Sequence, residues 1–298
     1  MQSLNEPTIS ILTDYGLTDE FVGVVKGVIR QLAPRSTVID VSHGVTAHDI
    51  RAGSLTLSRA VQYLPDGVVL AIVDPGVGTH RRAIAVEVDN DDCHLVFVGP
   101  DNGLLAPAVA MAGGATRAFE LTNTDLHLDT PGATFAGRDI FAPVAARLSA
   151  GMPLEDCGKP VDPNSLLPGV LPLSRMEDQM LFAEVLWVDH FGNAQLNVDP
   201  QELVPFGDVV SVRFGGVDAP TRSGRVARTY GDLRTGEIGL VIDSYGLVSV
   251  ALDRASAAQE LGLAESMSVV ISEADVPPTV KPAPVSISMG TRPAPAQD

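Results

Sequence analysis

The stretch VDPGVGTHRR, residues 73–82, places a carboxylate and a guanidinium on either side of a glycine-containing turn. If the turn brings Asp74 and Arg81 together, Arg81 would hold a fixed carboxylate that can orient a water molecule for reaction. A structural ion pair that only pins the loop would have the same sequence. The glycine spacing does not fit a dinucleotide-binding loop, because no helix follows it closely.

A second stretch, TFAGRDIFAP at residues 134–143, has the composition of an active-site loop that leads into a helix. It contains a glycine and a charged pair, which are typical of such loops. Ala136, however, carries a methyl group at the position where catalysis would need a proton acceptor.

Two acids near the N-terminus are candidate ligand contacts. Asp14 lies where an apolar strand stops and a helix begins, and a carboxylate there can accept hydrogen bonds from a diol such as a ribose. It could equally cap the helix that follows. Asp19 could meet a ligand ammonium group, although acids are common at helix N-termini in any case.

The second half of the chain offers two further polar turns. In WVDHFGNAQLN, Asp189 and Asn193 flank a turn, and Asn193 could bind a nucleobase or an amino-acid carboxylate. The alternative is a plain hairpin loop. In DSYGLVSVALDRASAA, Ser244, Tyr245 and the backbone near Ala255 are candidates, although the pattern alone indicates only a strand, a turn and small residues.

Composition excludes several classes of function. The net charge of −17 makes nucleic acid an unfavourable partner. No apolar run has the length of a membrane helix, and the N-terminus lacks a signal pattern, so a cytoplasmic protein is expected. Cys93 and Cys157 are too few for a disulfide framework. The histidines show no metal-binding spacing, and neither a nucleophile elbow nor a phosphate-binding Walker loop occurs.

The elements that must position these residues fall into two domains. Over residues 1–160, β-branched runs alternate with helical patterns, which predicts an α/β domain with a largely parallel sheet and ligands at the carboxyl ends of its strands. Residues 161–178 are proline-rich and predict a linker. Short strand patterns over 179–275 predict a smaller all-β domain, and 276–298 a disordered tail.

Taken in order, seven motifs resemble the S-adenosylmethionine hydroxide adenosyltransferases, the hydrolytic relatives of fluorinase and chlorinase. The resemblance runs from about Thr8 to about Ser272. The motifs are LTDYGLTDEFVG, DVSHGVTAHDIRAG, VDPGVGTHRR, VGPDNGLL, TFAGRDIFAP, DHFGN and DSYGLVSVALDRASAA. The resemblance implies an α/β domain, a β domain and a homotrimer whose active sites lie between one subunit's first domain and its neighbour's second domain.

The resemblance also implies roles for the candidate residues. Asp14 would hold the ribose hydroxyls and Asp19 the methionine ammonium. His48 falls where the halogenases place a Trp beside the ribose, and Tyr245 falls where the fluorinase has an Arg. The other implied substrate contacts are Phe135, Gly137, Asp189, Asn193, Ser244, Arg254 and Ala255.

The turn at Asp74 has the hydrolase form DPGVG, because the halogenases carry a Tyr in place of this Asp. The resemblance implies that Asp74 and Arg81 belong to an Asp–Arg–His set that activates water. Ala136 stands where that His belongs, whereas Gly137 follows the hydrolase and chlorinase pattern. Three explanations stay open for Ala136: a deliberate His-to-Ala variant, a natural divergence with another way to hold water, and a binding protein that has lost catalysis.

The reaction implied is hydrolysis of S-adenosyl-L-methionine to adenosine and L-methionine by attack of water at C5′, with no metal and no cofactor. A fixed carboxylate at Asp74 would repel a halide, which disfavours the first alternative, a halide-dependent adenosyl transferase. The second alternative is a non-catalytic protein that binds adenosylmethionine or adenosine.

Overall fold

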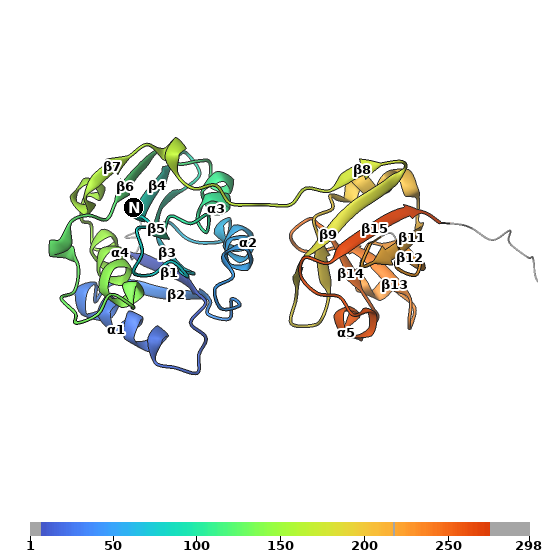
Figure 1. The fold of residues 1–298 in the computed structure, drawn as a ribbon, viewed down its shortest axis with the longest axis horizontal. Helices are drawn as coiled ribbons and strands as arrows, with labels where there is room; N and C mark the ends of the chain where they lie inside the picture. The colour runs from blue at the N-terminus through green and yellow to red at the C-terminus, as the bar shows by residue number, and fades with distance from the viewer. Residues whose placement is uncertain (1–6, 217, 275–298) are drawn as a thin grey trace, which may run out of the picture.

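The computed structural model describes residues 7–216 and 218–274, so the tail predicted at 276–298 lies outside the described residues. The described chain forms two domains that one extended segment connects (Figure 1). The first domain is α/β and the second is a β domain, as the sequence predicts.

The sheet of the first domain has seven strands in the order β2-β1-β3-β5-β4-β6-β7. β2, β1, β3 and β5 run parallel to one another, whereas β4, β6 and β7 are paired antiparallel. The sheet is therefore mixed rather than largely parallel. A tight turn closed by Asn90 and Cys93 joins β4 to β5 and is too short for the crossover that a parallel pair needs. The strands are β1 (Thr8–Thr13), β2 (Thr37–Ser42), β3 (Gly67–Ile72), β4 (Ala83–Asp89), β5 (His94–Pro100), β6 (Arg117–Glu120) and β7 (Lys159–Val161).

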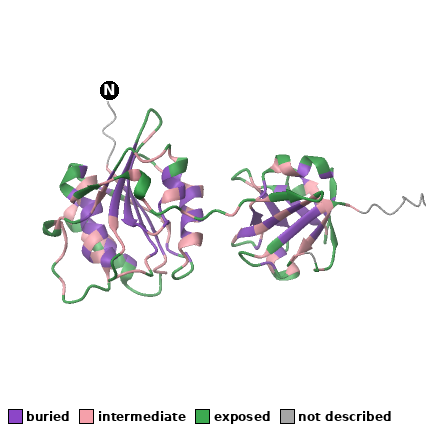
Figure 2. Ribbon diagram, turned by 45° about the horizontal axis from the view of Figure 1, so that its top comes forward, coloured by how far each residue is buried: buried purple, intermediate pink, exposed green. Residues whose placement is uncertain are grey.

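Helices cover both faces of this sheet, and Figure 2 shows the buried strands between them. α1 and α4 supply core residues on one face, and α2 and α3 on the other. Among the described residues, no helix is long and apolar enough to cross a membrane. The helices are α1 (Phe21–Leu32), α2 (Ile50–Val61), α3 (Ala106–Met111) and α4 (Ala142–Ser149), with short turns η1 (Thr124–Leu126), η2 (Gly137–Phe141), η3 (Leu154–Cys157) and η4 (Pro163–Ser165).

The second domain is a barrel-like sheet in the order β10-β14-β13-β12-β11-β15-β9-β8, which a further pairing of β10 with β9 closes. Side chains such as Val185, Val212 and Val250 fill its interior and are fully buried. Its elements are β8 (Arg175–Glu177), β9 (Met180–Val188), β10 (Ala194–Leu196), η5 (Pro200–Phe206), β11 (Val209–Phe214), β12 (Arg222–Ala227), η6 (Tyr230–Asp232), β13 (Ile238–Ile242), β14 (Val248–Ala251), α5 (Ala257–Leu261) and β15 (Ser268–Glu273).

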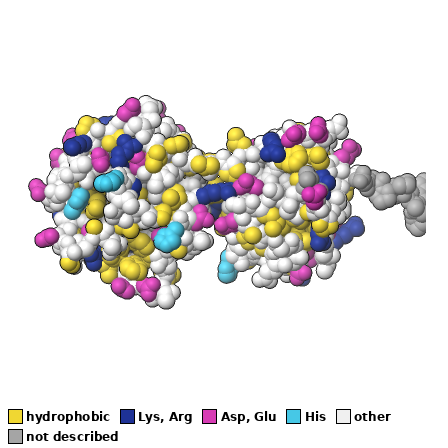
Figure 3. Space-filling model, in the orientation of Figure 1, with side chains coloured by type: hydrophobic (Ala, Val, Ile, Leu, Met, Phe, Trp, Pro, Cys, Tyr) yellow, Lys and Arg dark blue, Asp and Glu magenta, His cyan; other side chains and the backbone are white. Residues whose placement is uncertain are grey.

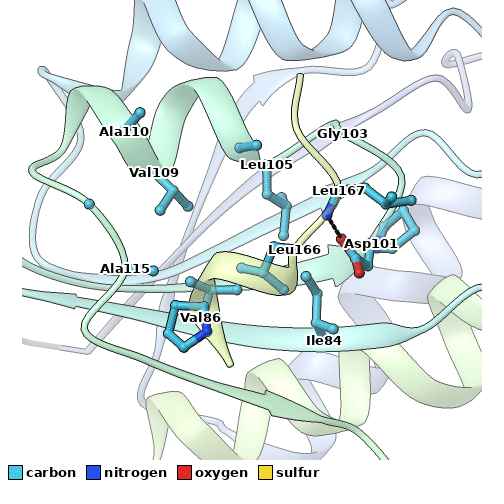
Figure 4. A pocket seen from close by; sticks show the side chains of 14 residues that line it. Ile84, Val86, Asp101, Gly103, Leu105, Val109, Ala110, Ala115, Leu166 and Leu167 are labelled. Carbon is cyan, nitrogen blue, oxygen red and sulfur yellow. Dashed lines mark hydrogen bonds between the residues drawn. The ribbon is translucent and has the colours of Figure 1, made fainter. Parts of the chain in front are cut away.

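The connecting segment is anchored to the first domain before it crosses to the second. The buried carboxylate of Asp101 accepts the backbone N–H of Leu167 at 2.9 Å, as Figure 4 shows, and also the Arg82 Nε–H at 2.8 Å. Arg82 in turn donates to the backbone oxygen of Ser165 at 2.6 Å. These hydrogen bonds anchor the chain as far as Leu167, and Gly169 still packs closely against Pro107 of the first domain.

The two domains touch through α2 and β9. Arg51 of α2 pairs with Glu184 of β9 and donates to the Ser266 hydroxyl at 2.7 Å. About two helical turns further along α2, the Arg59 guanidinium lies 4.1 Å from the centre of the Trp187 ring of β9. Figure 3 shows basic and acidic side chains side by side at this junction.

Candidate active site

A pocket of about 260 Å³ opens at the carboxyl ends of β1 and β3. Asp14 follows β1 and Asp74 lies just past β3, so the two neighbouring parallel strands deliver both carboxylates to one edge of the sheet, as the sequence predicts for an α/β domain. We call this cavity the first pocket. Its lining is Asp14, Tyr15, Phe21, Ala47, His48, Asp74, Val77, Thr134, Phe135, Ala136 and Gly137.

Asp74 and Arg81 do converge across their turn. Arg81 Nε lies 3.0 Å from each carboxylate oxygen of Asp74, and Arg81 Nη2 lies 2.6 Å from Oδ2. The side chains are only 6% and 14% exposed, and the guanidinium also lies 5.1 Å from the centre of the Phe141 ring. A buried bidentate pair of this kind holds the carboxylate in one orientation, and that carboxylate borders the first pocket.

Asp14 does not cap the helix that follows, because α1 starts at Phe21 with Glu20 as its N-terminal flank. Instead, Asp14 Oδ2 accepts the backbone N–H of His48 at 2.9 Å. His48 adopts a left-handed backbone conformation with a φ of 68°. This hydrogen bond joins the loop after β1 to the loop after β2 at the rim of the first pocket.

Three aromatic rings form one wall of this pocket. The ring centres of Tyr15, Phe21 and Phe135 lie 5.1–5.8 Å apart in tilted and edge-to-face arrangements. Burial raises the pKa of the Tyr15 hydroxyl, and the nearby carboxylates of Asp14 and Asp74 raise it further. Both effects favour the protonated form of the Tyr15 hydroxyl.

Gly137 is required by the close approach of this tyrosine. A Cβ at position 137 would lie 2.2 Å from the Tyr15 hydroxyl oxygen, which is closer than real atoms come. Sequence reasoning had selected Gly137 but missed Tyr15 and Phe21. The signal for Tyr15 was its place directly after Asp14 in the motif LTDYG.

Ala136 lies on the wall between the first pocket and a neighbouring cavity of the same domain. It lines both cavities and is itself 7% exposed. The neighbouring cavity also contains Arg81, His127 and Asp139 in its lining. A larger side chain at position 136 would therefore grow into space next to the Asp74–Arg81 pair.

The candidates from the second half of the chain line a separate pocket on the β domain, which we call the second pocket, with a volume of about 690 Å³. Asp189 organises its loop: its carboxylate accepts the backbone N–H of Phe191 at 2.9 Å and both the backbone and side-chain N–H groups of Asn193 at 2.8 Å. The lining is Asp189, Phe191, Asn193, Tyr230, Ser244, Leu252, Arg254, Ala255 and Ser256.

Two selected residues lie apart from both pockets. Asp19 is exposed and is absent from the lining of the first pocket. Tyr245 lines an apolar groove between the domains, with its ring 6.4 Å from that of Trp187 and 5.8 Å from the Arg59 guanidinium. Within residues 7–216 and 218–274, no group of three or more His, Cys, Asp or Glu side chains is arranged to hold a metal ion.

The fold and the pockets define a class of two-domain proteins in which strand-end loops of an α/β domain and loops of a β barrel each line a pocket. The comparisons identify that class. Residues 9–158 match the model of the SAM hydroxide adenosyltransferase N-terminal domain, and residues 183–270 match that of the C-terminal domain. The chain belongs to the SAM hydroxide adenosyltransferase family.

Individual relatives agree with this assignment. The (R)-S-adenosyl-L-methionine hydrolase of Salinispora tropica is 47% identical over 86% of this chain and 94% of its own length. The fluorinase of Actinopolyspora mzabensis is more distant, at 27% identity over 91% of this chain and 98% of its own. The crystal structure of a conserved uncharacterized protein from Thermotoga maritima superposes with a TM-score of 0.80 at 37% identity, covering 89% of this chain and all of that one.

Proposed function

We propose that this chain hydrolyses S-adenosyl-L-methionine to adenosine and L-methionine. The observation that carries the proposal is the buried Asp74–Arg81 pair, which presents a fixed carboxylate to the first pocket. A relative that is 47% identical and is named as an (R)-S-adenosyl-L-methionine hydrolase supports the same reaction and suggests the (R) sulfonium epimer as the preferred substrate.

In the proposed reaction a water oxygen forms a bond to C5′ while the C5′–S bond breaks and its electron pair passes to sulfur. The sulfonium becomes the neutral thioether of methionine, and the water loses one proton. A sulfonium is already an activated leaving group, so no acid, metal or redox cofactor is needed. The enzyme's task is to align the water with the C5′–S bond and to exclude bulk solvent.

Asp74 would orient this water. Arg81 occupies both carboxylate oxygens from one side, so the carboxylate cannot turn away from the pocket that it borders. The carboxylate accepts a hydrogen bond from the attacking water and passes the released proton on to solvent. With a methyl group at Ala136, no imidazole from that position assists, so we propose that Asp74 alone serves as the acceptor.

The substrate would bridge the two pockets. In the first, Asp14 would accept the ribose hydroxyls, with His48, Phe135 and Gly137 around the sugar. Asp19 is exposed and lies outside the lining of that pocket, so it would meet the methionine ammonium only where the substrate extends beyond the pocket. In the second pocket, the contacts to adenine and methionine would come from Asp189, Asn193, Ser244, Arg254 and Ala255.

We further propose a homotrimer with active sites between subunits. The support is that the two pockets are lined by different domains, the first by residues 14–137 and the second by residues 189–256. A small ligand that needs both sets of contacts would then receive the second set from a neighbouring copy. Tyr245, which lies beside Trp187 between the domains, would affect such a site only through the packing of the chain.

Chromatography of reaction products tests the proposal. Wild-type protein is incubated with each sulfonium epimer, in buffers with and without chloride, beside Asp74→Asn as the control that keeps the shape of the side chain. Adenosine and methionine in equal amounts, lost in the control, are the expected result. Formation of 5′-chloroadenosine would show a halogenase instead, and binding without any product would show a binding protein.

A further inference from the structure

A continuous chain of hydrogen bonds leads from the surface to the backbone of Tyr15, and Tyr15 is the one member of this chain that lines the first pocket. It starts on the surface, where Lys26 Nζ donates to Asp40 Oδ2 at 2.6 Å. Asp40 Oδ1 lies 3.1 Å from His43 Nε2, and His43 Nδ1 lies 2.9 Å from the Thr13 hydroxyl. The Thr13 hydroxyl finally accepts the backbone N–H of Tyr15 at 3.2 Å.

The middle of this chain is shielded from water. The His43 side chain is 4% exposed and Thr13 is 1% exposed, whereas the Asp40 side chain at the outer end is 47% exposed. Buried polar groups are costly when they lose their partners, so each link in the interior depends on the next one. A buried imidazole with both nitrogens engaged has one fixed orientation.

The hydrogen-bond directions are consistent with a single arrangement. The Asp40 carboxylate can only accept, so His43 Nε2 carries the proton and donates to it. In the neutral imidazole with its proton on Nε2, His43 Nδ1 is an acceptor, and the Thr13 hydroxyl donates to it. The lone pairs of the Thr13 oxygen remain free to accept the Tyr15 N–H. In this arrangement the His43 Nε2–H, the Thr13 O–H and the Tyr15 N–H each have one acceptor.

His43 also holds the loop after β1 through its main chain. Its carbonyl oxygen accepts the backbone N–H of Gly16 at 2.8 Å, and Gly16 has a left-handed φ of 67°. Residues 13–16 are therefore tied to His43 at both ends. Between these ties lie Asp14 and Tyr15, which both line the first pocket.

We propose that His43 is a positioning residue of the active site, acting through Thr13 to fix the backbone that aims Asp14 and Tyr15 into the first pocket. The inference rests on the proposed function in so far as it concerns an adenosyl ligand. The residue makes no contact with the pocket itself, so its effect is expected on ligand affinity and KM, with a smaller effect on kcat.

Two matched pairs of variants test this. Thr13→Val removes the hydroxyl and keeps the shape, whereas Thr13→Ser keeps the hydroxyl. His43→Asn keeps an acceptor near the Nδ1 position and so retains the Thr13 contact, whereas His43→Gln extends toward Asp40 and loses it. We expect Thr13→Val and His43→Gln to weaken adenosine binding about tenfold, as loss of a buried hydrogen bond allows, and Thr13→Ser and His43→Asn to stay nearer wild type.

Calorimetric titration with adenosine gives the affinity, and hydrogen exchange of the peptide spanning residues 13–16 gives the order of the loop without any ligand. His94→Asn is the control, because His94 pairs with Asp89 at 3.3 Å on the amino end of β5, away from the pocket. Faster exchange of this peptide in Thr13→Val but not in Thr13→Ser or His94→Asn supports the proposal.

The two readouts separate the possible failures. If exchange over residues 13–16 and adenosine affinity are the same in Thr13→Val as in wild type, His43 has no positioning role and the inference is overturned. If wild-type protein binds no adenosine, the proposed function fails, while the exchange data still decide whether His43 orders the loop. A drop in melting temperature with unchanged affinity and exchange would show a purely structural role, which also overturns the inference.

Discussion

Ala136 is the residue at which a single side chain has the largest expected effect. It faces the first pocket and the cavity that contains Arg81, so an imidazole has room beside the Asp74–Arg81 pair. A general base at this place would take the proton from the attacking water. We expect Ala136→His to raise kcat by about 10²-fold, which is the lower range for general-base catalysis. Steady-state release of adenosine measures the change.

The matched control is Ala136→Phe, which adds a ring of similar size without a basic nitrogen. It should leave kcat at or below the wild-type value, because it fills the space but accepts no proton. Equal rates for the His variant and the wild type would mean that Asp74 already supplies all of the proton acceptance that the reaction can use.

Among single residues, the acids of the first pocket could be predicted from the sequence, whereas some of the residues that surround and position them could not. Asp14 and Asp74 are predicted from their places at strand ends and Arg81 from its place across the turn from Asp74, and the fold brings the two acids to one sheet edge. Tyr15 and His43 were missed, because their significance lies in burial and in partners distant along the chain. A lone Tyr or His in a motif carries no sign of those partners.

Among the elements, the π-helical turn η2 determines how the loop at Ala136 enters the pocket. The wider turn at Gly137–Phe141 leads directly into α4, and its first residue packs under the Tyr15 hydroxyl. Such π turns are rare and occur frequently at functional sites.

Gly137→Ala should therefore disturb the pocket more than an added methyl group usually does. The new Cβ would lie 2.2 Å from the Tyr15 hydroxyl oxygen, so the ring or the loop must move. We expect KM to rise about tenfold, as overpacking of this kind costs ~1–3 kcal/mol. Adding Tyr15→Phe removes the clashing oxygen, and the double variant should recover part of the lost affinity. If the free-energy losses of the two single variants, calculated from their KM values, simply add in the double variant, the clash is not the cause of the weaker binding.

In the sheet of the first domain, the strands could be predicted from the sequence but the direction of some of them could not. Alternating apolar strands and helices correctly indicated an α/β domain, but the direction of β4, β6 and β7 depends on the turns between them. The Asn90–Cys93 turn is a hairpin signal hidden in a run of polar residues, NDDC, with no glycine. Strand direction at this edge followed from loop length rather than from hydrophobic pattern.

At the scale of the whole molecule, the division of the ligand contacts between two pockets allows a test by mixing subunits. Asp74→Asn disables the first pocket and Asn193→Ala the second. If active sites form between copies, each variant alone is nearly inactive, but mixed trimers contain some sites built from two intact halves. Co-expression of the two variants at equal amounts should restore about a quarter of wild-type activity.

Sedimentation analysis of the same samples reports the oligomeric state. A trimer with restored activity is the expected result. Activity that stays at the level of the single variants would mean that one chain supplies both halves of its own site, in which case the domains must come together around the ligand.

The carboxylates of the first pocket also bear on how the reaction ends. The proposed substrate has a net positive charge, which Asp14, Asp74 and the acidic surface of the protein attract. Neither adenosine nor methionine has a net charge, so the attraction disappears when the C5′–S bond breaks. Raising the salt concentration should therefore raise KM for the substrate while leaving the inhibition constant of adenosine nearly unchanged. An enzyme of this kind would lose its hold on the products through the chemical step itself, and turnover would continue as adenosine accumulates.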